Sequence, residues 1–290
     1  MIQTATEVEI GAVRGYNGSI QELIDTPVIR IGSVPYLNSK VLTYGLQPRT
    51  ATYTFESHVP SVLSRMLRDG SIDVALLSSI EFFRTPGLQI VPSISISSHG
   101  EIWSIQLYHR VPLRKARRIA MDPASETTNA LLQIILQEKM GLGVELVDLE
   151  LSEDPLKRDD LDGFLKIGDP CLLFNPPAGY EMIDLAAEWY AFTNLPFVFA
   201  VWLCRAGIDL ERVNMDLFLA KKEGLRNVET IAREEAPKLG LDFARTKQYI
   251  SRIVKYDLGR EELGGMSLFG RYLVRQQIIR ECPEFNFYTR

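Results

Sequence analysis

The chain has 290 residues, of which 46% are apolar and 24% charged, and these values are typical of a globular protein rather than of a disordered or collagen-like chain. At roughly 150 residues per domain, the length allows two domains. The net charge of −5 gives no overall attraction for nucleic acid or for an anionic membrane, so we expect neither as a partner. An anionic ligand would need a local site of hydrogen-bond donors.

The cysteines and the N-terminal sequence indicate the cellular compartment in which the protein is expected. Cys171, Cys204 and Cys282 lie far apart and form no CxxC pair, which argues against a disulfide framework and against structural zinc. Three histidines leave few positions for a metal site or a catalytic triad. The first residues lack a signal-peptide pattern, and the longest apolar run is about half of a membrane span. We therefore expect a cytoplasmic protein without a metal site.

Short β-branched runs alternate with helical patterns from about residue 27, as in α/β proteins. Strands are predicted at 28–34, 51–57 and 72–78. A helix is predicted between the last two, with Pro60 near its first turn and Gly70 near its C-terminal end.

Two extended segments follow, and the second runs from about residue 102 to 109. A period of two places Trp103, Ile105 and Leu107 on one face of this segment. The same period places Ser104 and Gln106 on the opposite face. Ser104 is therefore the polar member of an otherwise apolar strand.

A further strand is predicted at 117–122, and a hydroxyl-rich turn at 125–128 then opens a helix. This order presents free backbone N–H groups to an anion. A helix is expected at 184–192, a buried strand at about 197–204, and mostly helix from residue 209 onward. No glycine-rich phosphate loop follows any strand, which leaves a small-molecule site built from loops at strand ends.

Six segments together resemble one family. They are VPYLNSKVL (34–42), LLSSIEF (76–82), SSHGEIWSIQL (97–107), SETT (125–128), LKIGDPCL (165–172) and TNLPFVFAVW (193–202). Their order and spacing are similar to those of the MqnA family, the chorismate dehydratases that open the futalosine route to menaquinone. The resemblance covers about residues 29–207, and more loosely the helical tail.

The resemblance implies a two-lobed α/β fold like that of the type II periplasmic binding proteins, with the ligand in a cleft between the lobes. The first lobe would comprise residues 1–115 and 205–290, including the helical tail, and the second lobe residues 116–204. The segment before Thr26 has no counterpart in the family. The sequence leaves its role and the oligomeric state open.

The implied reaction is the loss of water from chorismate, a small dicarboxylate, to give 3-[(1-carboxyvinyl)oxy]benzoate. Because the ring becomes aromatic, modest catalytic machinery suffices. The enzyme must hold one conformer, exclude water, and assist one proton removal and one hydroxide departure. No cofactor is required, in keeping with the lack of nucleotide-binding motifs.

The family resemblance implies that Asn38 and Ser104 are catalytic. Alternatively, Asn38 is a turn residue that bonds its own backbone, and Ser104 is a half-buried structural serine. Neither an amide nor a lone serine hydroxyl is an effective base. We therefore hypothesise that a substrate carboxylate helps to remove the proton, while Asn38 and Ser104 orient it.

The hydroxyl groups of Ser125, Thr127 and Thr128 are candidate ligands of one substrate carboxylate. The same residues would cap a helix, and the two roles are compatible. Glu126 stands where relatives carry Arg, and we expect its side chain to point away from the dianionic substrate.

Ser78 and Ser79 end a predicted strand and are candidates for the second carboxylate, or alternatively for capping a short helix at 80–83. Asp169 would contact the ligand across the cleft or support its own loop. Asn194 replaces an expected glycine, and Asn tolerates positive φ well enough to keep the turn.

Two other functions remain open at this point. A solute-binding protein of the same fold would bind a small carboxylate without chemistry, although such an exported receptor would need a signal peptide. The neighbouring pathway enzyme, which makes 1,4-dihydroxy-6-naphthoate, would lack the VPYLNS and LPFVFAVW patterns.

Overall fold

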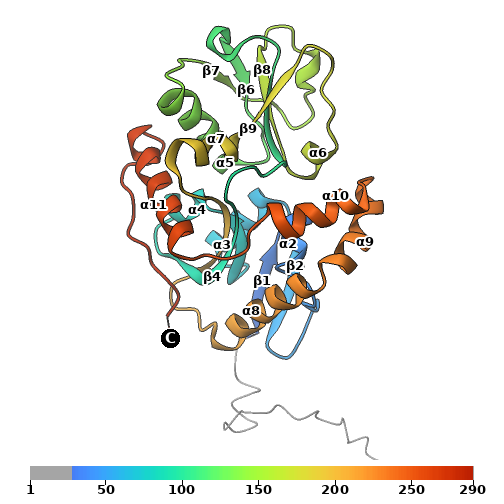
Figure 1. Cartoon of the computed structure of the whole chain (residues 1–290). Helices are drawn as coiled ribbons and strands as arrows, with labels where there is room; N and C mark the ends of the chain where they lie inside the picture. The colour runs from blue at the N-terminus through green and yellow to red at the C-terminus, as the bar shows by residue number, and fades with distance from the viewer. Residues whose placement is uncertain (1–27, 290) are drawn as a thin grey trace, which may run out of the picture.

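The structure, a computed structural model, describes residues 28–289, so the N-terminal segment of open role lies outside the described residues. Two lobes stand one above the other, each built on a five-stranded mixed sheet with helices packed around it (Figure 1). The predicted two-lobed α/β architecture is confirmed. No helix within residues 28–289 is long and apolar enough to cross a membrane.

The first lobe contains the sheet ordered β2-β1-β3-β10-β4. Its strands are β1 (Ile29–Ser33), β2 (Tyr53–Ser57), β3 (Val74–Ser78), β4 (Leu88–Ser98) and β10 (Phe197–Arg205). The first three pair in parallel, whereas β10 runs antiparallel to β3 and β4. The strand β10 is predominantly apolar because it is central in the sheet and helices cover its faces.

The second lobe contains the sheet ordered β7-β6-β8-β5-β9. Its strands are β5 (Ile105–His109), β6 (Arg118–Ala120), β7 (Glu145–Val147), β8 (Gly163–Ile167) and β9 (Glu181–Asp184). Its helices are α5 (Glu126–Ile134), which continues into a π-helical turn (Ile135–Lys139), α6 (Gly168–Leu173) and α7 (Leu185–Thr193). The strands β6, β7 and β8 are parallel, and β5 is antiparallel to both of its neighbours.

The positions of β5 and β10 differ from the lobe boundaries expected at residues 115/116 and 204/205, since β10 pairs with β3 and β4 in the first sheet. Ile105–His109 pairs with β8 and β9 in the second sheet, so the chain already changes sheets between Ser98 and Ile105. All five residues of β5 are buried, and this pattern does not reveal to which sheet a strand belongs. The predicted alternation also ends at Trp103, whose φ of 64° takes it out of the strand.

Several local predictions are confirmed. Helix α3 (Pro60–Asp69) starts at Pro60 and ends at Gly70, which has the left-handed conformation. Ser125 caps α5, and its side chain accepts the N–H of Thr128. Asn194 ends α7 with a φ of 55°, as expected for an Asn in place of glycine.

The C-terminal helices surround the first lobe and reach the second. They are α8 (Glu211–Arg226), α9 (Val228–Leu239), α10 (Phe243–Gln248), a π-helical turn η4 (Tyr249–Ile253) and α11 (Arg260–Arg275). Helix α11 runs along the side of both lobes (Figure 1). Near its end, Gln276 accepts a hydrogen bond from Gln133 in the second lobe at 3.1 Å. Gly265 permits the close approach of α11 to Pro196, because a Cβ there would lie 2.0 Å from the carbonyl oxygen of Pro196.

Candidate active site

A cavity between the lobes collects most of the predicted site residues. Its volume is about 90 Å³, and both lobes contribute to its wall. The predicted residues that line it are Asn38, Ser78, Ser104, Ser125 and Thr128. Most of the remaining lining is apolar, including Ile96, Ile105 and Phe199. The cavity therefore offers a few neutral hydrogen-bonding groups in apolar surroundings, as small-molecule sites do.

Asn38 and Ser104 meet at a third residue, Tyr249. The phenol of Tyr249 donates a hydrogen bond to Oγ of Ser104 at 2.9 Å. The Asn38 side chain lies against the same phenol. Its Oδ1 is buried and has no hydrogen-bond partner within residues 28–289, so it is available to a ligand. Burial raises the pKa of Tyr249 above its usual value, and the phenol keeps its proton at neutral pH.

Asp184 fixes the segment that carries Ser104. One carboxylate oxygen of Asp184 accepts the N–H of Ile102 at 2.9 Å, the N–H of Trp103 at 2.8 Å, and Nε2 of Gln106 at 2.7 Å. The other oxygen caps α7. Trp103 has a positive φ that a bulky residue rarely adopts, and such a conformation persists only where its surroundings enforce it. Asp184 thereby holds the residues on both sides of Ser104.

Asp169 supports Asn38 from the other lobe. Its carboxylate oxygens accept the N–H of Leu37 at 3.2 and 3.1 Å, and Leu37 begins the short helix α2 (Leu37–Lys40) that carries Asn38. Burial raises the pKa of Asp169 to about 6. Asp169 does not line the cavity, and its hydrogen bonds go to the other lobe rather than to its own loop, so they correspond to neither of the two roles expected for it.

The hydroxyl groups of Ser125, Thr127 and Thr128 at the start of α5 do not all face the cavity. Ser125 and Thr128 line the cavity, and their hydroxyl oxygens are 2.9 Å apart. Thr127 is 1% exposed and points elsewhere, since its Oγ1 accepts the N–H of Ile80 in the first lobe at 3.1 Å. Thr127 joins the two lobes and does not line the cavity.

The two serines at the end of β3 also separate. Ser78 lines the cavity. Ser79 is fully buried, and its hydroxyl donates to the carbonyl oxygen of Val198 at 2.7 Å. Ser79 occupies the N-cap position of α4 (Ile80–Arg84) but makes no side-chain cap bond. The structure therefore leaves only Ser78 of this pair facing a ligand.

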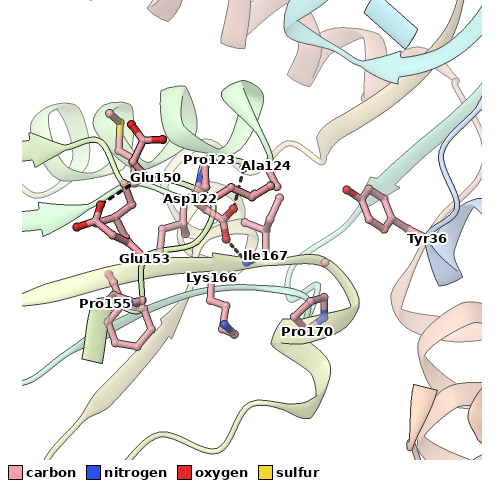
Figure 2. Close-up of a pocket in the computed structure, with 16 residues that line it drawn as sticks. Tyr36, Asp122, Pro123, Ala124, Glu150, Glu153, Pro155, Lys166, Ile167 and Pro170 are labelled. Carbon is pink, nitrogen blue, oxygen red and sulfur yellow. Dashed lines mark hydrogen bonds between the residues drawn. The ribbon is translucent and has the colours of Figure 1, made fainter. Parts of the chain in front are cut away.

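A second hollow of about 230 Å³ adjoins the cavity and shares Tyr36, Ala124, Ile167 and Gly168 with it. Figure 2 shows Tyr36 on the first-lobe side, with its ring directed across the gap toward Ala124 and Ile167. The buried carboxylate of Asp122 holds the opposite wall together by accepting the N–H groups of Ala124 at 2.9 Å and Ile167 at 3.0 Å. The hollow and the cavity therefore share one wall, built from both lobes.

The described residues that line the cavity include almost no titratable side chains. Among the residues that line it, Tyr36 alone is titratable, and burial raises its pKa above the usual value. Glu126 lies outside the cavity with its side chain 63% exposed, and it forms an ion pair with Arg84 of the first lobe. Residues 28–289 contain no cluster of three or more His, Cys, Asp or Glu side chains arranged to hold a metal ion.

Sequence reasoning missed Tyr249, Tyr36 and Asp184. Tyr36 belongs to the VPYLNS segment, and Asp184 precedes a helical pattern as N-cap residues do, so both carried a signal. Tyr249 lies in a helical tail 145 residues from Ser104, and no local pattern connects the two.

The family profile described as menaquinone biosynthesis matches residues 29–275. The chain belongs to this family. A chorismate dehydratase from Thermus thermophilus is 30% identical over 233 residues, which cover 74% of this chain and 84% of the relative. A chorismate dehydratase from Campylobacter jejuni is 25% identical over 219 residues, which cover 76% of this chain and 83% of the relative.

Solved structures share the fold at low sequence identity. A protein from Archaeoglobus fulgidus has a TM-score of 0.65 and 16% identity, covering 87% of this chain and 98% of that protein. The periplasmic aliphatic sulphonate binding protein of Escherichia coli has a TM-score of 0.62 and 16% identity, covering 89% of this chain and 95% of that protein. These likenesses confirm the fold of the periplasmic binding proteins.

Proposed function

We propose that this protein is a chorismate dehydratase, a hydro-lyase that converts chorismate to 3-[(1-carboxyvinyl)oxy]benzoate. Two relatives across most of the chain bear that name. The structural observation that carries the proposal is the presence of Asn38 and Ser104 in one cavity between the lobes. The resemblance to solute-binding proteins rests on the fold alone, at 16% identity for the sulphonate binding protein.

Neutral donors recognise the two carboxylates of the substrate. The N-terminal turn of α5 has backbone N–H groups without intrahelical partners, and the hydroxyls of Ser125 and Thr128 stand beside them at the cavity wall. Ser78, which lines the cavity from the first lobe, is the donor that we assign to the second carboxylate. Hydrogen bonds to a charged group contribute about 1.5–3 kcal/mol each, so two or three are enough to hold one carboxylate.

The reaction uses the substrate's own carboxylate as the base, because the residues among 28–289 that line the cavity include no carboxylate, imidazole or amine. The carboxylate takes the proton from the ether-bearing carbon, and the C–H electrons form the ring double bond as the C–O bond to the 4-hydroxyl breaks. The hydroxide takes the proton of Ser104 and leaves as water. Ser104 regains a proton from the newly formed carboxylic acid, so the protons balance.

The direct experiment is incubation of the purified protein with chorismate, followed by chromatography and mass spectrometry against an incubation without protein. The proposal predicts a product lighter than chorismate by one water, with the retention time of 3-[(1-carboxyvinyl)oxy]benzoate. A non-catalytic solute-binding protein would bind chorismate and return it unchanged. That result would contradict the proposal.

A further inference from the structure

We propose that Tyr249 is a positioning residue for dehydration. The Tyr249 phenol donates a hydrogen bond to the Ser104 hydroxyl, and the proton of Ser104 is thereby directed to the substrate. This inference rests on the function proposed above. It concerns a residue from the C-terminal segment that lies outside all six motifs of the sequence analysis.

The hydrogen bond determines what Ser104 can do. A serine hydroxyl has one proton and two acceptor lone pairs. Because the Tyr249 phenol donates to Oγ of Ser104 at 2.9 Å, the Ser104 proton is free for another acceptor. Ser104 faces the cavity, where that acceptor is the departing hydroxyl of the substrate. An accepted hydrogen bond also polarises the hydroxyl and makes it a better donor.

Burial makes this contact difficult to replace. Tyr249 is 1% exposed and Ser104 is 2% exposed, so water does not substitute for the phenol in the described structure. Burial also raises the pKa of Tyr249, which keeps the donor protonated at neutral pH. A buried hydroxyl that loses its partner carries the full desolvation penalty of that group.

Asn38 lies beside Tyr249 as well. The Asn38 side chain lies against the phenol, while its buried Oδ1 remains without a partner in the described part of the chain. Tyr249 itself lies in the π-helical turn η4, which follows α10 and turns Tyr249 and Ile250 inward together. Turns of this type are frequent at functional sites. The phenol thereby joins both predicted catalytic residues.

The test is a double-mutant cycle on the full chain with chorismate as substrate. Tyr249→Phe should lower kcat by about 10- to 100-fold, with KM changed by less than about threefold. Ser104→Ala should lower kcat further. Adding Tyr249→Phe to Ser104→Ala should then have no additional effect, because Tyr249 acts through the missing hydroxyl.

The matched control is Tyr256→Phe. Tyr256 is also buried, and its hydroxyl has no hydrogen-bond partner within the described residues. Loss of its hydroxyl should leave kcat within about twofold of the wild-type value, since no hydrogen bond of the described structure is removed. Should Tyr249→Phe fail to fold, the Ser104→Ala/Tyr249→Phe variant removes both hydroxyls and still permits comparison with Ser104→Ala.

Wild-type kcat in Tyr249→Phe would overturn the inference. So would a double variant whose loss equals the product of the two single losses, because the phenol would then act independently of Ser104. Either result leaves the dehydratase function intact. A wild-type protein that does not convert chorismate contradicts the proposed function itself, and the inference falls with it.

Discussion

Asp169 in the second lobe accepts the backbone N–H of Leu37 in the first lobe, at 3.2 and 3.1 Å from its two carboxylate oxygens. The next residue after Leu37 is Asn38, so a buried, titratable contact between the lobes lies directly beside a predicted catalytic group. Burial raises the pKa of Asp169 to about 6, although the Leu37 hydrogen bonds oppose this shift. The contact therefore changes its charge in a physiologically relevant range.

Asp169→Asn should change how stability depends on pH. The folded-state pKa of about 6 lies above the ordinary value of 3.8, so the favourable contribution of the protonated form is complete below about pH 3.8 and is lost as the pH rises through about 6. The asparagine oxygen still accepts the Leu37 N–H without a buried charge. We expect Asp169→Asn to exceed the wild type in free energy of unfolding by about 1–3 kcal/mol at pH 8.

Denaturant unfolding of both proteins at pH 4 and pH 8 measures this difference. It should nearly vanish at pH 4. A variant that is less stable than the wild type at pH 8 would show that the charged carboxylate makes a net favourable contact with Leu37, contrary to the expectation.

Asp184→Asn should reduce both stability and turnover. The carboxylate accepts hydrogen bonds from Ile102, Trp103 and Gln106 on one oxygen and caps α7 with the other. Both oxygens of Asp184 accept N–H groups, whereas an asparagine has only one acceptor oxygen. The NH₂ group of the asparagine would therefore face N–H donors that it cannot bind. We expect a loss of about 2–4 kcal/mol in unfolding free energy. Because the Ser104 segment loosens, kcat should fall as well.

Thermal unfolding and steady-state kinetics measure the two effects of Asp184→Asn. The control is Asp69→Asn, since Asp69 is exposed at the end of α3 and accepts hydrogen bonds from Ser71, which follows the helix. Unchanged kcat in a destabilised but folded Asp184→Asn variant would mean that Asp184 does not position Ser104.

Glu126→Gln should tighten the binding of chorismate without changing kcat. Glu126 is largely exposed, so its ion pair with Arg84 adds little stability. Removal of its negative charge near the cavity frees Arg84 and reduces repulsion of a dianion. We expect KM to fall about two- to fivefold at low salt, and the effect to shrink at high salt. Glu223→Gln on α8 is the control, and an equal fall in KM there would contradict a local effect.

The features that depend only on residues close together in the sequence could be predicted from it. Ser125 before an apolar helix predicts its own capping role, and Gly70 predicts the end of α3. Asn38 lies in α2, the first element after β1, so a position near the carboxyl end of that strand follows from chain order. Short-range hydrogen bonding and helix geometry decide all of these features.

The remaining features depend on contacts between distant residues. Ser79 and Thr127 carry the same hydroxyl chemistry as Ser78 and Thr128, but they bond to Val198 and Ile80 in other segments. Tyr249 reaches Ser104 across 145 residues. No local pattern encodes such pairs, because the packing of the two lobes and the C-terminal helices decides them.

The most direct test of the account compares chorismate turnover and chorismate binding in Ser104→Ala and Asn38→Ala. If these side chains act on the reacting atoms, each variant should lose at least about 100-fold in kcat, while the Kd measured by calorimetry stays within about fivefold of the wild-type value. The exposed Ser71→Ala is the control and should match the wild type. Wild-type kcat in both variants would contradict the claim that this cavity performs the dehydration.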